Sequence, residues 1–373
     1  MAGPSGAAKV VVAKIGTSSI TDAHGDIDEQ AIAKFCAEVA DLRAAGHQVV
    51  AVTSGAIAAG LPAIGLGGDR RPRDAVTLQA LSAVGQSRLM RVYDRLLDGH
   101  GIVSGQVLLA PLDFVVRAQY LHARGTLLRL LELGVVPIVN ENDAIADDEI
   151  RFGDNDRLAA LVAHLVDADL LVLLTDTAGV LTADPRFDAS ASLIEEIIEV
   201  DHELEAMAGG AGTDRGSGGM ASKIAAAKMA AWSGVRTVIA AAHRDGVLTD
   251  AVAGAAGVGT VVLPRDRRLP ARKLWIAFAV ASAGTIVVDA GARRALEADG
   301  RSLLPAGVIE VRGSFHADAA VEVAGPDGAV FAKGLSRVSS ADLSHRAGTH
   351  SATLPDGTPP EVIHRDDLVI LPY

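Results

Sequence analysis

The sequence is poor in cysteine, in long apolar runs and in the features of an export signal. Cys36 is the single cysteine, so neither an intramolecular disulfide nor a cysteine-based metal cluster can form. Its apolar neighbours recur at helical spacing, which predicts a buried, inert thiol rather than a nucleophile. Such a composition suits a reducing cytoplasm, where we expect the protein to be. No apolar run reaches the roughly 20 positions of a membrane-spanning helix, and the N-terminus lacks the charged and apolar segments of a secretory signal. We therefore expect neither membrane association nor export.

Positive charge and aromatic residues are also scarce. The formal net charge is −12 at pH 7, so the surface as a whole repels nucleic acids and anionic membranes. Only 3% of the residues are aromatic, which leaves few side chains for stacking on bases. Nucleic acid is therefore not an expected partner. An acidic substrate would need a local cluster of lysines, helix N-termini or a metal ion.

Short β-branched runs alternate with amphipathic helical patterns up to Pro264. Most runs are continuously apolar, as expected of parallel strands that helices cover on both faces. The predicted strands are 10–14, 48–53, 103–109, 135–139, 170–175, 237–241 and 260–263. The predicted helices are 28–45, 75–97, 115–133, 155–166 and 219–233. This pattern predicts an α/β fold with a mainly parallel sheet between helices.

The pattern changes after Pro264. The stretch RDRRLPARK is charged, contains proline and has no apolar period, which indicates a domain boundary. Beyond it we expect one helix near 292–298 and short strands at 285–288, 308–311, 320–323, 330–333 and 368–371. This tail predicts a small, mostly β barrel. The two expected domains are 1–265 and 272–373.

Polar residues gather where the predicted strands end, and ligands bind at this edge of open parallel sheets. The first strand ends at Lys14, before a small, hydroxyl-rich turn that suits a phosphate group. The second ends in Thr53-Ser54-Gly55, whose following helix could hold a carboxylate. The NEND run at 140–143 and the GDND run at 153–156 contain more polar residues than helix capping requires. A capping box followed by a turn is the alternative interpretation.

Two further segments have features of a nucleotide site. Thr175 and Asp176 end the fifth predicted strand. The run GSGGMASK at 216–223 is a glycine-rich loop that enters a helix, so its amides could hold phosphates while Lys223 reaches the transferred group. A flexible surface loop is the alternative. The P-loop signature is absent, and the His-Arg-Asp run at 364–366 lacks the asparagine of a protein-kinase catalytic loop.

Seven segments, in order along the chain, resemble the glutamate 5-kinase family: VVVAKIGTSS, VTSGAIAAG, LSAVGQSRLM, VPIVNENDAIA, FGDNDRLAALVA, LLTDTAGVLTADPR and GSGGMASKIAAA. The KIGTS turn alone also resembles the wider amino-acid kinase family, whereas NENDAIA together with FGDNDRLAALVA is more specific. The tail segments SLLPAGV, GLSRVSSADL and VIHRDDLVIL are similar to the PUA domain that follows the kinase domain in many bacterial members. The resemblance covers nearly the whole chain.

The resemblance implies the amino-acid kinase fold, Mg²⁺ with ATP as the phosphoryl donor and L-glutamate as the acceptor. The product would be γ-glutamyl 5-phosphate, formed in the first step of proline biosynthesis. By motif, the implied catalytic residues are Lys14, Lys223, Asp156 and Asp154. The implied glutamate-binding residues are Ser54, Asp143, which would read the ammonium group, and Asn155. The implied nucleotide-binding residues are Lys14, Thr175, Asp176, Ser217, Gly218, Gly219, Met220, Ala221, Ser222 and Lys223. The metal ligands are left unassigned.

The chemistry of this transfer agrees with those residues. A carboxylate is a nucleophile at neutral pH, so catalysis needs alignment and charge neutralisation rather than a general base. The nucleotide loop reads GSGGMASK where the family more often has GTGGMSTK, and TDTAG replaces a lysine-containing turn. Both departures keep the backbone donors.

Several alternatives stay open. The acceptor could be acetylglutamate, aspartate or UMP instead of glutamate, as in other amino-acid kinases. A role in RNA binding or RNA modification is the interpretation from another class, and only the PUA-like tail favours it. The sequence also leaves open proline feedback, the size of the expected homo-oligomer, the role of the tail and direct transfer of the product to a γ-glutamyl phosphate reductase.

Overall fold

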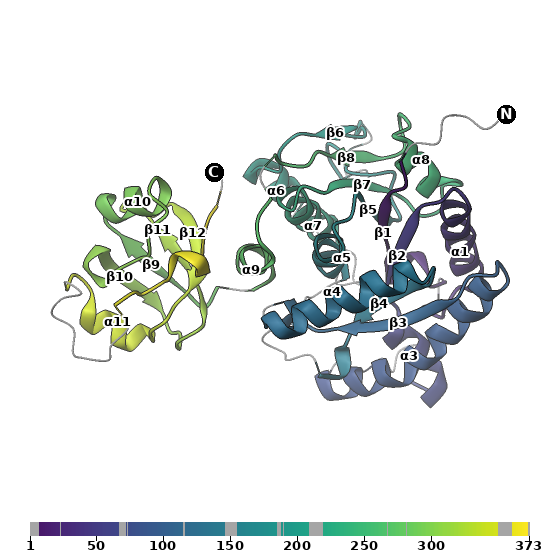
Figure 1. Cartoon of the computed structure of the whole chain (residues 1–373), viewed down its shortest axis with the longest axis horizontal. Coiled ribbons are helices and arrows are strands. Elements are labelled where there is room, and N and C mark those ends of the chain that lie inside the picture. The colour runs from purple at the N-terminus through teal and green to yellow at the C-terminus, as the bar shows by residue number, and fades with distance from the viewer. Residues whose placement is uncertain are drawn as a thin grey trace. The chain divides into compact units, whose positions relative to one another are not determined.

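The chain forms two compact units, Met1–Arg268 and Leu269–Tyr373 (Figure 1). The computed structural model describes residues 7–22, 24–66, 72, 74–114, 116–145, 155–184, 188, 190–208, 219–266, 268–280, 282–349 and 360–371. The narrower domain limits inferred above, 1–265 and 272–373, stay predictions.

The first unit is built on an eight-stranded sheet in the order β3-β4-β2-β1-β5-β7-β8-β6. Its strands are β1 (Val10–Ile15), β2 (Gln48–Thr53), β3 (Ser104–Leu109), β4 (Val136–Glu141), β5 (Leu170–Thr175), β6 (Glu196–Ile197), β7 (Arg236–Ala241) and β8 (Thr260–Val262). The described pairings are parallel except for that of β7 with β8, which is antiparallel. The predicted α/β class with a mainly parallel sheet is confirmed.

Helices cover both faces of this sheet. They are α1 (Glu29–Ala44), α2 (Ala56–Gly60), α3 (Ala75–Asp98), α4 (Arg117–Glu132), α5 (Asn155–Leu165), α6 (His202–Ala208), α7 (Met220–Trp232) and α8 (Val247–Ala253). On one face α1 packs against α3 and α8, and on the other α5 packs against α7 and contacts β1 and β5 (Figure 1). The five helices predicted in this region are confirmed to within two residues at each end.

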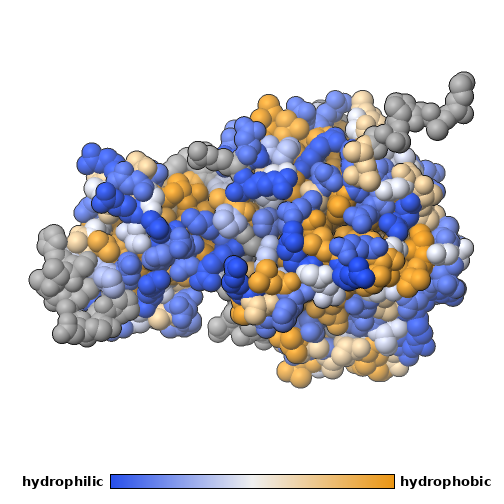
Figure 2. Space-filling view, viewed as in Figure 1, coloured by the Kyte–Doolittle hydropathy of each residue, from blue (hydrophilic) through white to orange (hydrophobic). Residues whose placement is uncertain are grey.

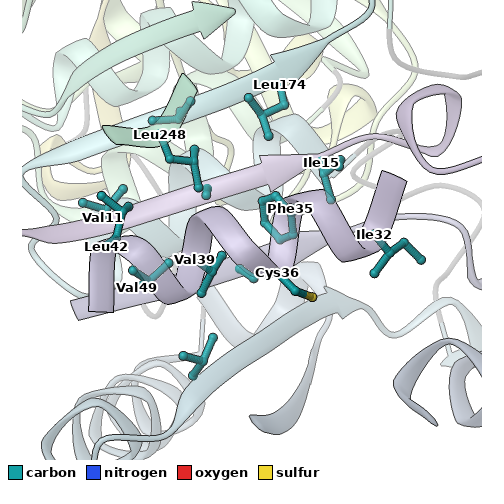
Figure 3. Close-up of a cluster of buried hydrophobic side chains, with 14 of the residues drawn as sticks. Val11, Ile15, Ile32, Phe35, Cys36, Val39, Leu42, Val49, Leu174 and Leu248 are labelled. Atoms are coloured by element: carbon teal, nitrogen blue, oxygen red, sulfur yellow. The ribbon is translucent and has the colours of Figure 1, made fainter. Parts of the chain in front are cut away.

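Side chains along β1 point alternately to the two faces of the sheet. The odd-numbered residues of Val11–Ile15 pack with Phe35 and other buried residues of α1, as Figure 3 shows for the two ends of this range. Because successive strand side chains point to opposite faces, Lys14 points toward the face that α5 covers. The apolar run therefore places a lysine in the interior beneath α5.

Helix α1 confirms the prediction for the single cysteine. The side chain of Asp28 caps the helix by accepting from the backbone N–H groups of Gln30 and Ala31. Cys36 is on the buried face of the helix, and burial raises the pKa of its thiol to about 12. The predicted buried and inert thiol is confirmed, because almost no thiolate forms at neutral pH.

The second unit has a separate five-stranded sheet in the order β10-β9-β11-β12-β13. Its elements are α9 (Ala271–Leu274), β9 (Gly284–Val288), α10 (Ala290–Glu297), β10 (Val308–Gly313), β11 (Ala320–Ala324), β12 (Val330–Leu335), α11 (Ser340–Arg346) and β13 (Leu368–Ile370). Phe331 and Val321 are fully buried in its own apolar core. The predicted strands are confirmed, whereas α11 was not predicted, because it buries only Leu343 and so has a weak apolar period.

Candidate active site

Three charged side chains meet in the interior of the first unit. The Nζ atom of Lys14 lies 2.5 Å from Oδ1 of Asp156, and the Nζ atom of Lys223 lies 3.1 Å from Oδ2. The hydroxyl of Ser222 donates to the same Oδ2 at 2.9 Å. Asp156 is 0% exposed, Lys14 3% and Lys223 5%. One buried carboxylate thus holds two ammonium groups that come from segments far apart in the sequence.

Opposing effects set the charge of Asp156. Burial raises the pKa of its carboxyl group, but the charges of Lys14 and Lys223 and the hydrogen bonds from Lys14 and Ser222 outweigh burial and hold this pKa below its ordinary value. Asp156 is therefore ionised at neutral pH. Two ammonium groups held side by side on one carboxylate attract an anion such as a phosphoryl group.

Asp156 and Lys223 each lie in the first turn of a helix, and these two helix starts place them beside Lys14 of β1. Helix α5 begins at Asn155 and α7 at Met220, so both side chains belong to the first turn of helices that pack on each other. The first turn of a helix has unsatisfied N–H groups and a partial positive charge. The helix ends therefore add to the positive potential of the two lysines.

A second cluster adjoins the first because Asn155 precedes Asp156 in the chain. Its Nδ2 atom lies 2.9 Å from three oxygens: the backbone O of Thr53, Oγ of Ser54 and Oδ1 of Asn140. Asn155 thus links the carboxyl ends of β2 and β4. Its Oδ1 and the Nδ2 of Asn140 are buried without a hydrogen-bond partner among the described residues. Because buried polar groups are normally paired, these two atoms offer an acceptor and a donor that a polar ligand could complete.

Asp143 lies at the same edge of the sheet, in a short 3-10 helix (Asp143–Ile145) that follows β4. Its Oδ2 accepts a hydrogen bond of 2.7 Å from the hydroxyl of Ser82 in α3. One turn further along α3, Gln86 donates to the backbone O of Glu141 at 3.4 Å. Helix α3 therefore holds both the end of β4 and the residue that follows it.

The predicted nucleotide residues lie at the ends of β5 and α7. Thr175 is buried at the end of β5, beside β1, and its hydroxyl donates to the exposed Asp176 at 3.0 Å. Gly219 is the N-cap residue of α7, and Met220 to Lys223 form its first turn. Three predicted site residues, Asp154, Ser217 and Gly218, lie outside the described residues. The functional roles assigned to all these residues stay predictions.

Two polar residues in contact with the predicted site residues received no role from the sequence. Asn140 belongs to the NEND run, which was noted only as polar, and its contact with Asn155 depends on the neighbouring positions of α5 and β4. Helical spacing with Leu89 and Tyr93 places Ser82 on the buried face of α3. Its contact with Asp143 has no local signal, because the two residues are 61 positions apart.

Comparisons with known proteins agree with this geometry. The amino acid kinase family profile matches residues 9–241 and the PUA domain profile residues 284–357. Glutamate 5-kinases of Burkholderia cenocepacia and Burkholderia multivorans are each 48% identical over 367 residues, which cover 97% of this chain and 98% of the relative. The solved carbamate kinase from Giardia lamblia bound to AMP-PNP has a TM-score of 0.50 at 19% identity over 69% of this chain and 99% of that chain, which supports the fold. The chain therefore belongs to the amino acid kinase family and, within it, to the glutamate 5-kinases.

Proposed function

We propose that this enzyme transfers the γ-phosphoryl group of ATP to the side-chain carboxylate of L-glutamate, the first step of proline biosynthesis. The products are γ-glutamyl 5-phosphate and ADP. The observation that carries the proposal is the buried cluster of Lys14, Asp156 and Lys223, in a chain that matches glutamate 5-kinases along nearly its whole length.

The chemistry of the transfer requires charge neutralisation. A carboxylate oxygen of glutamate attacks the γ-phosphorus, the bond from that phosphorus to the oxygen bridging to the β-phosphate breaks, and ADP leaves with the electron pair. No proton has to move, because the nucleophile is already ionised. Lys14 and Lys223 offset the repulsion between the two anions, and Asp156 keeps the two ammonium groups in place. Asp154 belongs to the same catalytic set in this proposal.

Glutamate and ATP occupy neighbouring parts of the edge in this proposal. Ser54, Asn155 and Asp143 bind glutamate, the first two through the network at the ends of β2 and β4. Thr175, Asp176 and the segment 217–223 bind the nucleotide. The support for this division is that β1, which carries Lys14, lies between β2 and β5 in the sheet.

Magnesium accompanies ATP in this proposal. Mg²⁺ takes phosphate oxygens and water as ligands and needs only one or two protein carboxylates. Within the described part of the chain, no group of three or more His, Cys, Asp or Glu side chains could hold a metal by itself. A cation that arrives on the nucleotide fits this donor set and brings further positive charge to the phosphates.

The remaining partners and the location are also proposals. We place the enzyme in the cytoplasm, as a homo-oligomer that supplies γ-glutamyl phosphate to a reductase, because acyl phosphates are unstable. Apolar areas on the visible face of the first unit (Figure 2) and exposed side chains such as Leu121 and Leu133 offer surface for self-association. The net charge of −12 does not favour nucleic acid. None of the described helices is both long enough and apolar enough to cross a membrane.

The test is ADP release with Mg²⁺ and ATP in the presence of glutamate, acetylglutamate, aspartate or UMP. Hydroxylamine is added, because it traps an acyl phosphate as a hydroxamate. Of the four acceptors, we expect only glutamate to support ADP release and hydroxamate formation. Activity with a different acceptor, and none with glutamate, would keep the fold and refute the proposed substrate.

A further inference from the structure

One face of α3 contacts three points at the edge where glutamate is proposed to bind. Ser82 donates to Asp143 at 2.7 Å, Gln86 donates to the backbone O of Glu141 at 3.4 Å, and the hydroxyl of Tyr93 lies 2.8 Å from Oγ1 of Thr53. Ser82 is 1% exposed, Gln86 8% and Tyr93 0%. The helix therefore makes buried polar contacts with the ends of both β2 and β4.

The contact from Ser82 differs from the other two because its acceptor is an Asp side chain. A hydrogen bond to an ionised carboxylate is stronger than one between neutral groups. Asp143 lies in a short 3-10 helix after β4 and is only partly buried, whereas Ser82 is 1% exposed in a helix of 24 residues. A serine fixed in the middle of α3 can therefore set the direction in which this carboxylate points.

We propose that Ser82 is a positioning residue for amino-acid recognition, and that its hydroxyl orients the Asp143 carboxylate toward the α-ammonium group of glutamate. The inference rests on the proposed function, in which Asp143 binds that ammonium group. A carboxylate that is already oriented loses less conformational entropy when the substrate binds. Ser82 thus acts on the affinity for the amino acid and does not touch the transferred phosphoryl group.

Ser82→Ala tests the proposal. We expect kcat/KM for glutamate to fall about tenfold because KM for glutamate rises. The turnover number kcat and the KM for ATP should each stay within about twofold, because the lost contact acts on ground-state binding. Ser82→Thr keeps the hydroxyl and should restore most of the affinity. Ser233→Ala is the matched control, since Ser233 is also 1% exposed and donates to a backbone oxygen, that of Met229, at 3.0 Å. It should leave KM for glutamate unchanged.

A double-mutant cycle with Asp143→Asn separates positioning from a general structural role. If Ser82 acts through Asp143, adding Ser82→Ala to Asp143→Asn should lower kcat/KM by less than about twofold further. A full additional tenfold loss, or an unchanged KM in Ser82→Ala, would overturn the proposal. Equal losses of glutamate and ATP affinity would also overturn it, because they indicate a general disturbance.

Two further measurements keep the test decisive. If Ser82→Ala does not fold, Ser82→Cys fills a similar volume with a weaker donor and should give an intermediate KM for glutamate. A KM equal to that of the parent would count against the proposal. The parent enzyme is assayed first: no hydroxamate with glutamate would refute the proposed function, whereas parental turnover with no effect of Ser82→Ala would refute only the role of Ser82.

Discussion

Asp156 contacts its two lysines through different oxygens, Oδ1 with Lys14 and Oδ2 with Lys223. The planar carboxylate therefore sets the spacing between the two ammonium groups. Such a spacing suits a transferred phosphoryl group, whose negative charge is spread over several oxygens. Ser222 donates to the same carboxylate and restricts its rotation.

Lys223→Ala should lower kcat at least about 100-fold, because a group that stabilises transition-state charge is lost. KM for glutamate should change much less, since the substrate contacts stay in place. Steady-state kinetics with each substrate varied in turn provide the measurement. Lys228→Ala is the control: Lys228 is in the same helix and pairs with Glu205 at 2.8 Å. Unchanged turnover in Lys223→Ala would remove this lysine from its proposed role.

Asp156→Asn should change how the stability depends on pH. Because the lysines hold the pKa of Asp156 below its ordinary value of 3.8 in the folded state, the ionised carboxylate stabilises the fold above that pH. This contribution decreases as the pH falls through the lowered folded-state pKa. The variant should be less stable by about 3–5 kcal/mol near neutral pH, because two buried lysines lose their counter-ion.

Urea unfolding of both proteins from acidic to neutral pH measures this difference. The loss in the variant should stay constant from about pH 7 to pH 5 and shrink below about pH 4, where the unfolded parent takes up a proton. A difference that grows on acidification would contradict the stated direction of the pKa shift.

At the scale of elements, the crossing of α2 and α3 connects two parts of the proposed glutamate site. A Cβ atom on Gly85 would lie 1.6 Å from the backbone O of Ala56, and one on Gly60 would lie 2.2 Å from the backbone O of Leu81. The two backbones therefore touch, which only glycine permits at these positions. Because α2 begins two residues after Ser54, this contact sets where Ser54 lies relative to α3.

Gly85→Ala should force α2 and α3 apart and destabilise the protein by about 1–3 kcal/mol. It should also raise KM for glutamate, since Ser54 moves with α2. Gly125→Ala in α4 is the control, because its Cβ would meet nothing within 4 Å, and it should stabilise the protein by up to about 1 kcal/mol through helix propensity. Thermal unfolding and glutamate kinetics measure both effects. An unaltered melting temperature and KM in Gly85→Ala would show that the crossing can open without cost.

At the scale of the whole molecule, each of the two units has an apolar core of its own. The described members of the charged cluster and of the network of Asn155 all belong to the first unit. The second unit therefore contributes its own folding energy, and none of its described side chains belongs to these two groups of contacts.

Phe331→Ala tests this independence. Phe331 is 0% exposed, and the guanidinium carbon of Arg293 lies 5.0 Å from the centre of its ring. The substitution should destabilise the second unit by about 3–5 kcal/mol. Calorimetry should show that one unfolding transition shifts to a lower temperature. The kinetic constants, measured below that temperature, should stay at parental values. A rise in KM for glutamate at low temperature would show instead that the second unit supports the site.

Local patterns predicted most of the fold. The buried strands of the first unit are recognisable in the sequence, because strands that are covered on both faces are continuously apolar. Strand β6 was missed because Glu196–Ile197 is too short to show a pattern, and it forms only through its pairing with β8. Helix α11 was missed for a similar reason, since Leu343 is its only buried residue.

The sequence by itself determined the order of the main strands and helices and the position of Lys14 near the end of a strand, because each depends on neighbours in the chain. Only the tertiary structure decided that Asp156 pairs with Lys223, that Asn155 joins the ends of β2 and β4, and that Ser82 donates a hydrogen bond to Asp143. The last of these contacts spans 61 positions, that of Lys223 spans 67 and that of Asn155 with Thr53 spans 102. Local propensity carries no information over such separations, and these residues meet because the packing of helices on the sheet fixes their distance.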